Sequence, residues 1–177
     1  MISSPHLRGL TSLELFSNQI DDDGAKALAG WPQLKKFSTL QLGSNQITDA
    51  GAQALAASRH VAGITHLYLF DNKIGDAGVQ ALANSRYLKG IRELQLWKNP
   101  IGPAGAAALA NSANFANMEQ LLISQCPIRD QGPLALVSSP HLTQLTEFFM
   151  DRCGITQAGK QAIRNQTASR RCYPVLG

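Results

Sequence analysis

Residues 64–74, with the sequence ITHLYLFDNKI, decide the fold of this chain. Aliphatic residues alternate with other residue types along the first part of this stretch, which is the period-two pattern of a strand with one buried face. We therefore expect Leu67 and Leu69 to point into a core, and Tyr68 and Phe70 to point to the opposite face.

The same phrase recurs at intervals of 27 residues without an insertion. Its polar anchor is occupied in turn by Asn18, Asn45, Asn72, Asn99, Cys126 and Cys153. A fixed period of roughly 20–50 residues indicates a repeat solenoid. The six copies predict parallel strands centred on Leu13–Leu15, Leu40–Leu42, Leu67–Leu69, Leu94–Leu96, Leu121–Ile123 and Phe148–Met150.

Each strand is followed by a short, alanine-rich segment with the character of a helix. In the third copy we expect this helix over 77–84, with Asp76 as its N-cap and Gly78 allowing a close approach. Packed helices need ~8–10 Å each, whereas parallel strands need only ~4.8 Å. The predicted fold is therefore an α/β solenoid, a horseshoe arc of six 27-residue repeats with a parallel sheet on the concave face and helices on the convex face.

The anchor residues are predicted to form a structural ladder. A short amide at the end of a strand can satisfy backbone groups of the turn that would otherwise be buried without partners. Cys126 and Cys153 replace ladder asparagines, and no Cys-x-x-Cys or His-x-x-x-His spacing accompanies them. We expect both thiols to be buried and reduced, with no bound metal.

The pattern L-x-x-L-x-L-x-x-N/C-x-L is the signature of leucine-rich repeats. The chain resembles leucine-rich-repeat proteins of the ribonuclease-inhibitor-like class over roughly residues 3–166. Its second half-repeats, such as Gly24-Ala-Lys-Ala-Leu-Ala29 and Gly51-Ala-Gln-Ala-Leu-Ala56, resemble the bacterial GALA-type variant. The resemblance implies a protein that recognises other proteins; the F-box-like segment of some GALA-type proteins is not found in this sequence, so that role is not carried over.

Composition narrows the class of protein. With 44% hydrophobic residues, 177 residues suffice for one continuous core, and a net charge of +4 does not argue for nucleic acid. The sequence contains no apolar run long enough for a membrane span, and Met1–Pro5 lacks the character of a signal peptide. The odd number of three cysteines, two of them at ladder positions, favours a reducing compartment, which we take to be the cytoplasm.

The ends of the chain differ from its middle. Residues 3–7 match residues 138–142 five periods later, so we expect 1–9 to be the end of a truncated preceding repeat, left open or covered by a partner. Residues 10–166 then form six repeats and 167–177 a C-terminal tail or partial cap, all within a single domain over 1–177. Cys172–Val175 is expected to add a stunted seventh strand.

Candidate catalytic and metal sites have simpler explanations. His6, His60 and His141 share one repeat position, so inheritance of the repeat accounts for them. The acidic run Asp21–Asp23 is better explained by helix capping than by a calcium loop. No phosphate loop, nucleophile elbow or paired-carboxylate motif is found. We expect no enzymatic activity, no cofactor and no metal.

The face opposite the core is where the copies stop resembling one another. Side chains of neighbouring strands on one face are close enough to touch, so Tyr68, Phe70 and Trp97 should form one aromatic patch, flanked by His66, Glu93 and Lys98. Exposed aromatic residues with polar neighbours are typical of binding hot spots. The predicted partner-binding residues are His66, Tyr68, Phe70, Glu93, Gln95, Trp97 and Phe149.

Two functions remain open from the sequence. One is a non-enzymatic module that binds a protein partner on the concave sheet. The other is an architectural segment of a larger protein that self-associates through the open ends of the solenoid. Neither involves nucleic acid or a membrane.

Overall fold

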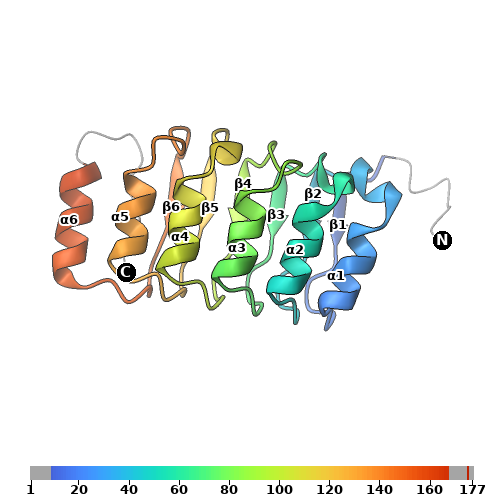
Figure 1. Cartoon of the computed structure of the whole chain (residues 1–177), viewed down its shortest axis with the longest axis horizontal. Helices are drawn as coiled ribbons and strands as arrows, with labels where there is room; N and C mark the ends of the chain where they lie inside the picture. The colour runs from blue at the N-terminus through green and yellow to red at the C-terminus, as the bar shows by residue number, and fades with distance from the viewer. Residues whose placement is uncertain (1–8, 168–174, 176–177) are drawn as a thin grey trace.

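A computed structural model describes residues 9–167 and residue 175 as a single row of stacked repeats (Figure 1). Six parallel strands form one sheet in the order β1-β2-β3-β4-β5-β6. The strands are β1 (Ser12–Glu14), β2 (Thr39–Gln41), β3 (His66–Tyr68), β4 (Glu93–Gln95), β5 (Gln120–Leu122) and β6 (Glu147–Phe149). Each residue pairs with the residue 27 positions later, as Leu40 does with Leu67. The predicted strands and their register are confirmed.

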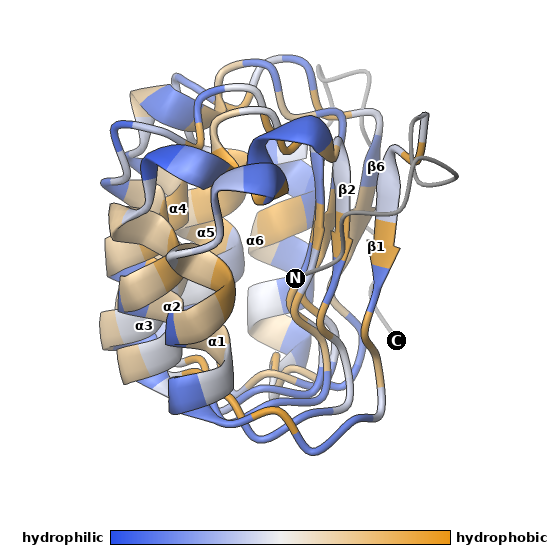
Figure 2. Cartoon of the chain, turned by 90° about the vertical axis from the view of Figure 1, so that its right-hand side faces the viewer, coloured by the Kyte–Doolittle hydropathy of each residue, from blue (hydrophilic) through white to orange (hydrophobic). Residues whose placement is uncertain are grey.

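One α-helix follows each strand and covers the same face of the sheet (Figures 1 and 2). The helices are α1 (Asp22–Ala29), α2 (Asp49–Ala57), α3 (Asp76–Ala83), α4 (Pro103–Ala110), α5 (Gln131–Val137) and α6 (Gln157–Thr167). Short 3-10 turns close three of the repeats, namely η2 (Pro32–Lys36), η3 (Arg59–Val61) and η4 (Ala113–Phe115). Figure 2 shows hydrophobic residues on the inner sides of both layers, where the core lies.

The stack is an arc with the sheet on its inner side. In Figure 1 the row of helices from α1 to α6 is wider than the row of strands behind it. This follows from the larger spacing of packed helices than of paired strands. The α/β solenoid predicted from the sequence is therefore confirmed, and its free sheet surface is the concave face.

The core contains the inward strand residues, the buried faces of the helices, such as Leu55 and Leu82, and one residue in the turn before each strand. Leu67 is 2% exposed and Leu69 fully buried. The preceding position is buried in every repeat that the structure describes, at Leu34, Val61, Leu88, Phe115 and Leu142. Its first member, Leu7, lies outside the described residues.

Asn45 shows how the ladder joins two repeats. Its amide oxygen accepts from the backbone N–H groups of Asn18 (3.0 Å) and Ile20 (2.9 Å) in the preceding turn. Its amide nitrogen donates to the carbonyls of Leu15 and Leu42, both at 3.0 Å. One buried side chain thus satisfies backbone groups of two successive turns, as expected from the sequence.

The other ladder positions vary this pattern. Asn72 and Asn99 are buried and bond to backbone in the same manner. Asn18 differs, because it is exposed and its amide nitrogen donates, among the described residues, to the carbonyl of Phe16 alone. Cys126 and Cys153 are buried, free thiols whose sulfur atoms each lie 3.3 Å from a carbonyl oxygen of the preceding repeat. Burial raises the pKa of Cys126 to about 12 and also raises that of Cys153, so both stay protonated at neutral pH.

The expected N-cap of α3 is wrong. The cap is Gly75, and Asp76 is the first residue of the helix. The Asp76 carboxylate instead accepts from the backbone N–H groups of Gly102 and Gly105, at the start of the next helix, α4. Asp49 makes the matching contacts with the start of α3, so each carboxylate caps its neighbour's helix.

Gly78 permits this contact between helices. A Cβ atom at Gly78 would lie 2.6 Å from Oδ1 of Asp49 and 3.1 Å from Cβ of Ala52, both on α2. The close approach predicted for this glycine therefore exists, and it brings α3 against α2.

A second ladder, made of serines, lies at the opposite end of the helices. Ser58, Ser85, Ser112 and Ser139 are buried, and the hydroxyl of each donates to a carbonyl at the end of the preceding repeat's helix. The histidines two positions later, His60 and His141, donate their backbone N–H groups to these hydroxyls. Tyr87 makes the same backbone bond at this repeat position, so the bond does not depend on the histidine side chain. His6 lies outside the described residues.

The two ends of the sheet are unlike. Val175 pairs in parallel with Phe149, which confirms one residue of the expected seventh strand, whereas Cys172 lies outside the described residues. At the β1 end, Leu10 is 49% exposed and Phe16 is 51% exposed. The assignment of 1–177 to a single domain with the boundaries given above stays a prediction.

The acidic run of the first repeat provides a test of capping between repeats. Asp22 accepts from the N–H of Thr48 (2.8 Å), its hydroxyl (2.6 Å) and the N–H of Gly51 (2.9 Å). Burial tends to raise the pKa of Asp22, but these hydrogen bonds outweigh it and hold the pKa below the usual value. We expect Asp22→Ala to lower the free energy of unfolding by ~0.5–2 kcal/mol at pH 7, as loss of a helix cap does.

The neighbouring carboxylate is the matched control. Asp23 is exposed and lies 4.0 Å from Lys26, so Asp23→Ala should change stability by less than ~0.5 kcal/mol. Because the folded-state pKa of Asp22 is lowered, its contribution is present above the unfolded-state pKa and lost as the pH falls below about 4. Urea unfolding at pH 7 and pH 3 measures both effects; equal losses for the two variants would contradict capping across the repeat boundary.

Candidate binding surface on the concave sheet

Each repeat has three outward positions on the concave face. They form three columns across the sheet. The columns are Ser12, Thr39, His66, Glu93, Gln120 and Glu147; then Glu14, Gln41, Tyr68, Gln95, Leu122 and Phe149; then Phe16, Gly43, Phe70, Trp97, Ser124 and Asp151. The middle of this face holds most of the residues predicted to bind a partner.

Phe70 and Trp97 form the most ordered feature of the face. Their rings stack with centroids 4.4 Å apart and planes 4° apart. Both residues are half-buried, so part of each ring is open to solvent. The stack joins β3 to β4 and provides a rigid apolar surface.

Gly43 provides the space in which Phe70 lies. A Cβ atom at Gly43 would be only 2.3 Å from Cζ of Phe70. The Phe70 ring therefore lies over the Gly43 backbone, which it covers, since Gly43 is buried. The contact with Gly43, just after β2, thereby helps to hold the two stacked rings in place.

Tyr68 does not join this stack, although the sequence predicts one patch of three rings. Its hydroxyl donates to Oε2 of Glu93 at 3.0 Å, and the amide of Gln95 donates to Oε1 of the same carboxylate at 2.6 Å. Burial, followed by the hydrogen bond to Glu93, raises the pKa of Tyr68 to about 12, so the phenol stays protonated. Tyr68, Glu93 and Gln95 are brought together as a polar group beside the two stacked rings.

The remaining predicted residues lie around these two groups. His66 is hydrogen-bonded to the hydroxyl of Thr65 through Nδ1, at 2.8 Å. Lys98 forms an ion pair with Asp71 at 2.9 Å, and Asp71 also accepts from the hydroxyl of Ser44. Phe149 stands apart: it pairs with Leu122 on β5 and is separated from Trp97 by that strand.

Sequence reasoning did not single out Ser124 and Asp151. Ser124 is buried, and its hydroxyl accepts from the backbone N–H of Asp151 at 3.2 Å. Both belong to the same column as Phe70 and Trp97. Their position in that column is the sequence signal by which they could have been found.

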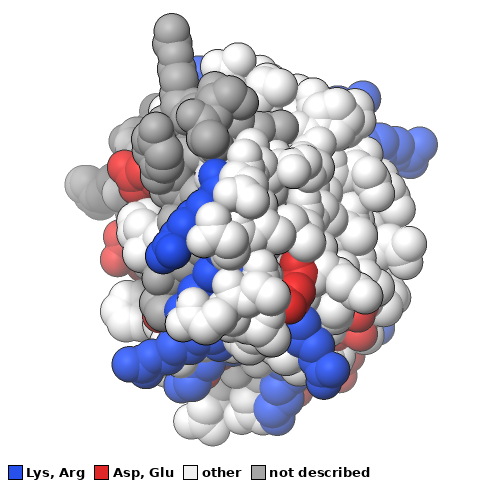
Figure 3. Space-filling view, turned by 90° about the vertical axis from the view of Figure 1, so that its left-hand side faces the viewer, with Lys and Arg blue, Asp and Glu red and all other residues white. Residues whose placement is uncertain are grey.

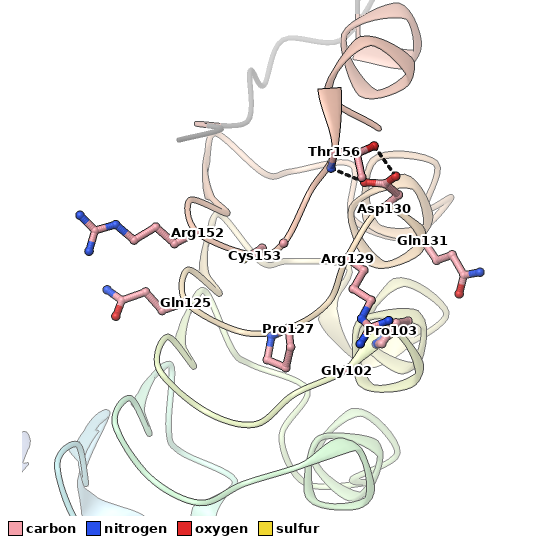
Figure 4. A pocket seen from close by; sticks show the side chains of 11 residues that line it. Gly102, Pro103, Gln125, Pro127, Arg129, Asp130, Gln131, Arg152, Cys153 and Thr156 are labelled. Atoms are coloured by element: carbon pink, nitrogen blue, oxygen red, sulfur yellow. Dashed lines mark hydrogen bonds between the residues drawn. The ribbon is translucent and has the colours of Figure 1, made fainter. Parts of the chain in front are cut away.

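A pocket lies away from the concave columns, in the loops between strands and helices of the last three repeats (Figure 4). Its polar residues do not converge. The Asp130 carboxylate is taken up by the N–H and hydroxyl of Thr156, whereas Arg152 points away from Asp130 and Arg129. Within the described ranges, no cluster of three potential metal-binding side chains is found. This pocket therefore offers no reactive arrangement.

Charge is unevenly distributed over the molecule. Figure 3 shows the end formed by α6, where basic side chains outnumber acidic ones. The outward positions of the strands have the opposite balance of charge. Their charged residues are Glu14, Glu93, Glu147 and Asp151, and none of these positions holds a lysine or an arginine. None of the helices in the described part of the chain has the length and apolar character needed to cross a membrane.

Comparisons with known proteins agree with this architecture. A family model described as leucine-rich repeat matches residues 6–29, 33–56, 64–83 and 91–110. A search of curated proteins found no significant match.

Two solved structures from Listeria monocytogenes are similar in fold. An internalin (inlF) is 21% identical with a TM-score of 0.56, over 93% of this chain and 47% of that chain. Internalin C2 (inlC2) is 18% identical with a TM-score of 0.54, over 97% of this chain and 82% of that chain. The chain thus spans about half the length of the first structure, and the similarity concerns the fold alone.

Proposed function

The chain is a leucine-rich-repeat protein, and from this premise we propose that it is a non-enzymatic module that binds a protein partner on its concave sheet. The observation that carries the proposal is the stack of Phe70 on Trp97. Two large rings on the solvent side of a sheet make no contribution to the core, yet they are held in one arrangement by the strands beneath them. Such preorganised aromatic area binds at a small entropic cost.

The surroundings of the stack support the same function. Polar groups at its edge, Glu93 with Tyr68 and Gln95, are already oriented by hydrogen bonds to one another. Apolar rings with polar neighbours are the usual composition of an interface centre and its rim. We propose that Tyr68, Phe70 and Trp97 lie at the centre of the contact, with Phe149 at its margin.

The proposal also includes the class of leucine-rich repeat and the cellular compartment of the protein. An α-helix on the convex side of each repeat supports the ribonuclease-inhibitor-like class, and the alanine-rich helices support the bacterial GALA-type variant. The two buried free thiols support a reducing compartment, for which we propose the cytoplasm.

A second function has one specific observation in its favour. The apolar side chains of Leu10 and Phe16 are about half exposed at the β1 end. An architectural segment that associates end to end would use them. Sedimentation over a hundredfold range of concentration distinguishes the two: the binding module stays at one mass, whereas the architectural segment grows in mass with concentration.

The binding function is tested by measuring whether the affinity for a partner falls when either ring of the stack is removed. Partners are first captured with the wild-type chain from a lysate or a displayed library, and their affinities are then measured for Phe70→Ala and Trp97→Ala. We expect each substitution to weaken binding by about tenfold or more, as removal of a hot-spot ring does. The cost in stability should be only ~0.5–1.5 kcal/mol, the value of one stacked pair.

Phe16→Ala is the matched control. Phe16 occupies the same column just after β1 but is 51% exposed, so its removal should leave both affinity and stability unchanged. A partner that binds the Phe70 and Trp97 variants as tightly as wild type would refute the proposed site. A variant that unfolds would show that the rings are needed for the fold instead.

A further inference from the structure

Glu93 is the carboxylate in the middle of the concave face. Among the outward positions on or just after β2 to β5, it is the only acidic residue, and none of these positions holds a lysine or an arginine. It stands on β4, in register with His66 on β3 and Gln120 on β5. His66 is hydrogen-bonded to the hydroxyl of Thr65, and Gln120 is neutral. Glu93 therefore lies inside the surface proposed to bind a partner.

Neutral donors hold the Glu93 carboxylate in one orientation. The Tyr68 hydroxyl donates to Oε2 at 3.0 Å, and the Gln95 amide donates to Oε1 at 2.6 Å. Neither donor carries a charge, and each carboxylate oxygen can accept a further hydrogen bond. Glu93 is half-buried, so its carboxylate is already partly removed from water without a countercharge to compensate.

The cations closest to Glu93 in the sequence are bound elsewhere. The guanidinium group of Arg92 lies 3.0 Å from the carboxylate of Glu119. The ammonium group of Lys98 lies 2.9 Å from the carboxylate of Asp71. Among the described residues, no cation forms an ion pair with Glu93. The charge of Glu93 is thus left to water and to two neutral side chains.

A partner that covers the concave face removes the water that remains around Glu93. Burying a carboxylate without a countercharge is costly, whereas a well-placed opposite charge recovers that cost and excludes wrong partners. Because the chain brings no cation of its own to this position, the partner has to supply one. Two further hydrogen-bond sites on the oriented carboxylate are available to receive it.

We infer that the protein partner places a positively charged side chain on Glu93 and an apolar one on the stack of Phe70 and Trp97. This inference rests on the proposed function, which it deepens by naming the chemistry of the partner. Glu93 and Trp97 are four residues apart on one extended segment, which corresponds to roughly 13 Å. An extended segment of the partner with a cation and an apolar residue four positions apart spans the same distance.

The experiment uses a defined probe with this spacing. The full chain is titrated with the peptide acetyl-GKGSGLG-amide and with its counterpart in which the lysine is Nε-acetylated, so that the stem is kept and the charge is lost. Binding is followed by the indole N–H resonance of Trp97, assigned by comparison with Trp97→Phe. We expect the lysine peptide to shift this resonance, leaving that of Trp31 in place, and to bind at least about threefold more tightly than the acetylated peptide.

Variants separate Glu93 from the general charge of the face. Glu93→Gln keeps the shape and removes the charge, so it should abolish the preference for the lysine peptide while leaving the affinity for the acetylated peptide unchanged. Glu14→Gln removes an equal charge at the β1 edge of the sheet and should leave the preference in place in about 0.15 M salt. The comparison of the two peptides on the wild-type chain needs no variant, so it stands even if Glu93→Gln lowers stability.

Three results would overturn the inference. They are equal affinity of the wild-type chain for the two peptides, equal loss of preference in Glu93→Gln and Glu14→Gln, and binding of the lysine peptide weaker than about 10 mM.

The proposed function is judged separately, with a captured partner. If that partner depends on Phe70 and Trp97 but binds Glu93→Gln as tightly as wild type, the concave face binds a partner that brings no cation to Glu93. If the partner does not depend on the two rings, the proposed function itself fails.

Discussion

Leu67→Ala is expected to lower the free energy of unfolding by ~2–5 kcal/mol, because it opens a cavity in a close-packed core. Leu67 is 2% exposed at the centre of β3, in register with Leu40 and Leu94, both fully buried. In a continuous solenoid core the neighbouring repeats are fixed by their own strands and helices, so they cannot collapse into the space. Urea unfolding followed by circular dichroism measures the loss.

The same substitution at the edge of the sheet is its control. Leu13 holds the equivalent position on β1 but is only half-buried. Leu13→Ala should therefore cost clearly less than Leu67→Ala, since part of that side chain is already in water. Equal losses at the two positions would mean that the core is not continuous through the repeats as described.

Asn72→Ala is the second large effect, with an expected loss of ~1–3 kcal/mol. The amide oxygen of Asn72 accepts from the N–H of Ile47 at 2.9 Å, and its nitrogen donates to the carbonyls of Leu42 and Leu69. Alanine leaves these buried backbone groups without partners, which costs more than the hydrogen bonds themselves contribute. Thermal or urea unfolding of the variant gives the magnitude.

Asn18 supplies the comparison for the ladder. It stands at the same repeat position, but its side chain is exposed and, within residues 9–167, makes one bond, to the carbonyl of Phe16. Asn18→Ala should cost less than ~0.5 kcal/mol, as is usual for exposed positions. If Asn72→Ala were as mild as Asn18→Ala, the ladder would not be what couples one repeat to the next.

Much of the fold could be predicted because the information is periodic. Leu67 and Asn72 reveal their roles by recurring every 27 residues, and the period also sets the register of β2 on β3. The buried Ser58, Ser85, Ser112 and Ser139 recur with the same period, so their ladder was equally visible in the sequence.

Contacts between repeats were harder to predict. Asp76 was assigned to its own helix because capping signals are local in sequence, whereas its carboxylate reaches Gly102, 26 residues later. Tyr68 was assigned to the aromatic patch because it lies beside Phe70, but Glu93 on the next strand draws its hydroxyl away. Such choices depend on side-chain orientation in a neighbouring repeat, which alternation along one strand does not encode.

On the concave face, too, some features could be predicted from the sequence and others required the structure. Its outward columns could be listed from the sequence, and they place Phe70 beside Trp97. That the rings stack, and that the absence of a side chain at Gly43 makes room for Phe70, required the structure.

Oxidative footprinting of side chains, with and without a captured partner, tests the binding function most directly. Trp97 and Phe70 should lose reactivity toward hydroxyl radicals when the partner is added, because the partner covers the stack. Trp31 and Phe37 are the internal control, because they lie outside the concave columns. They are half-buried, with ring centroids 5.8 Å apart. Their reactivity should be unchanged, which would exclude a general loss of oxidation when the partner is added. Protection of Trp31 and Phe37 with unchanged oxidation of Trp97 and Phe70 would contradict the assignment of the concave face as the binding surface.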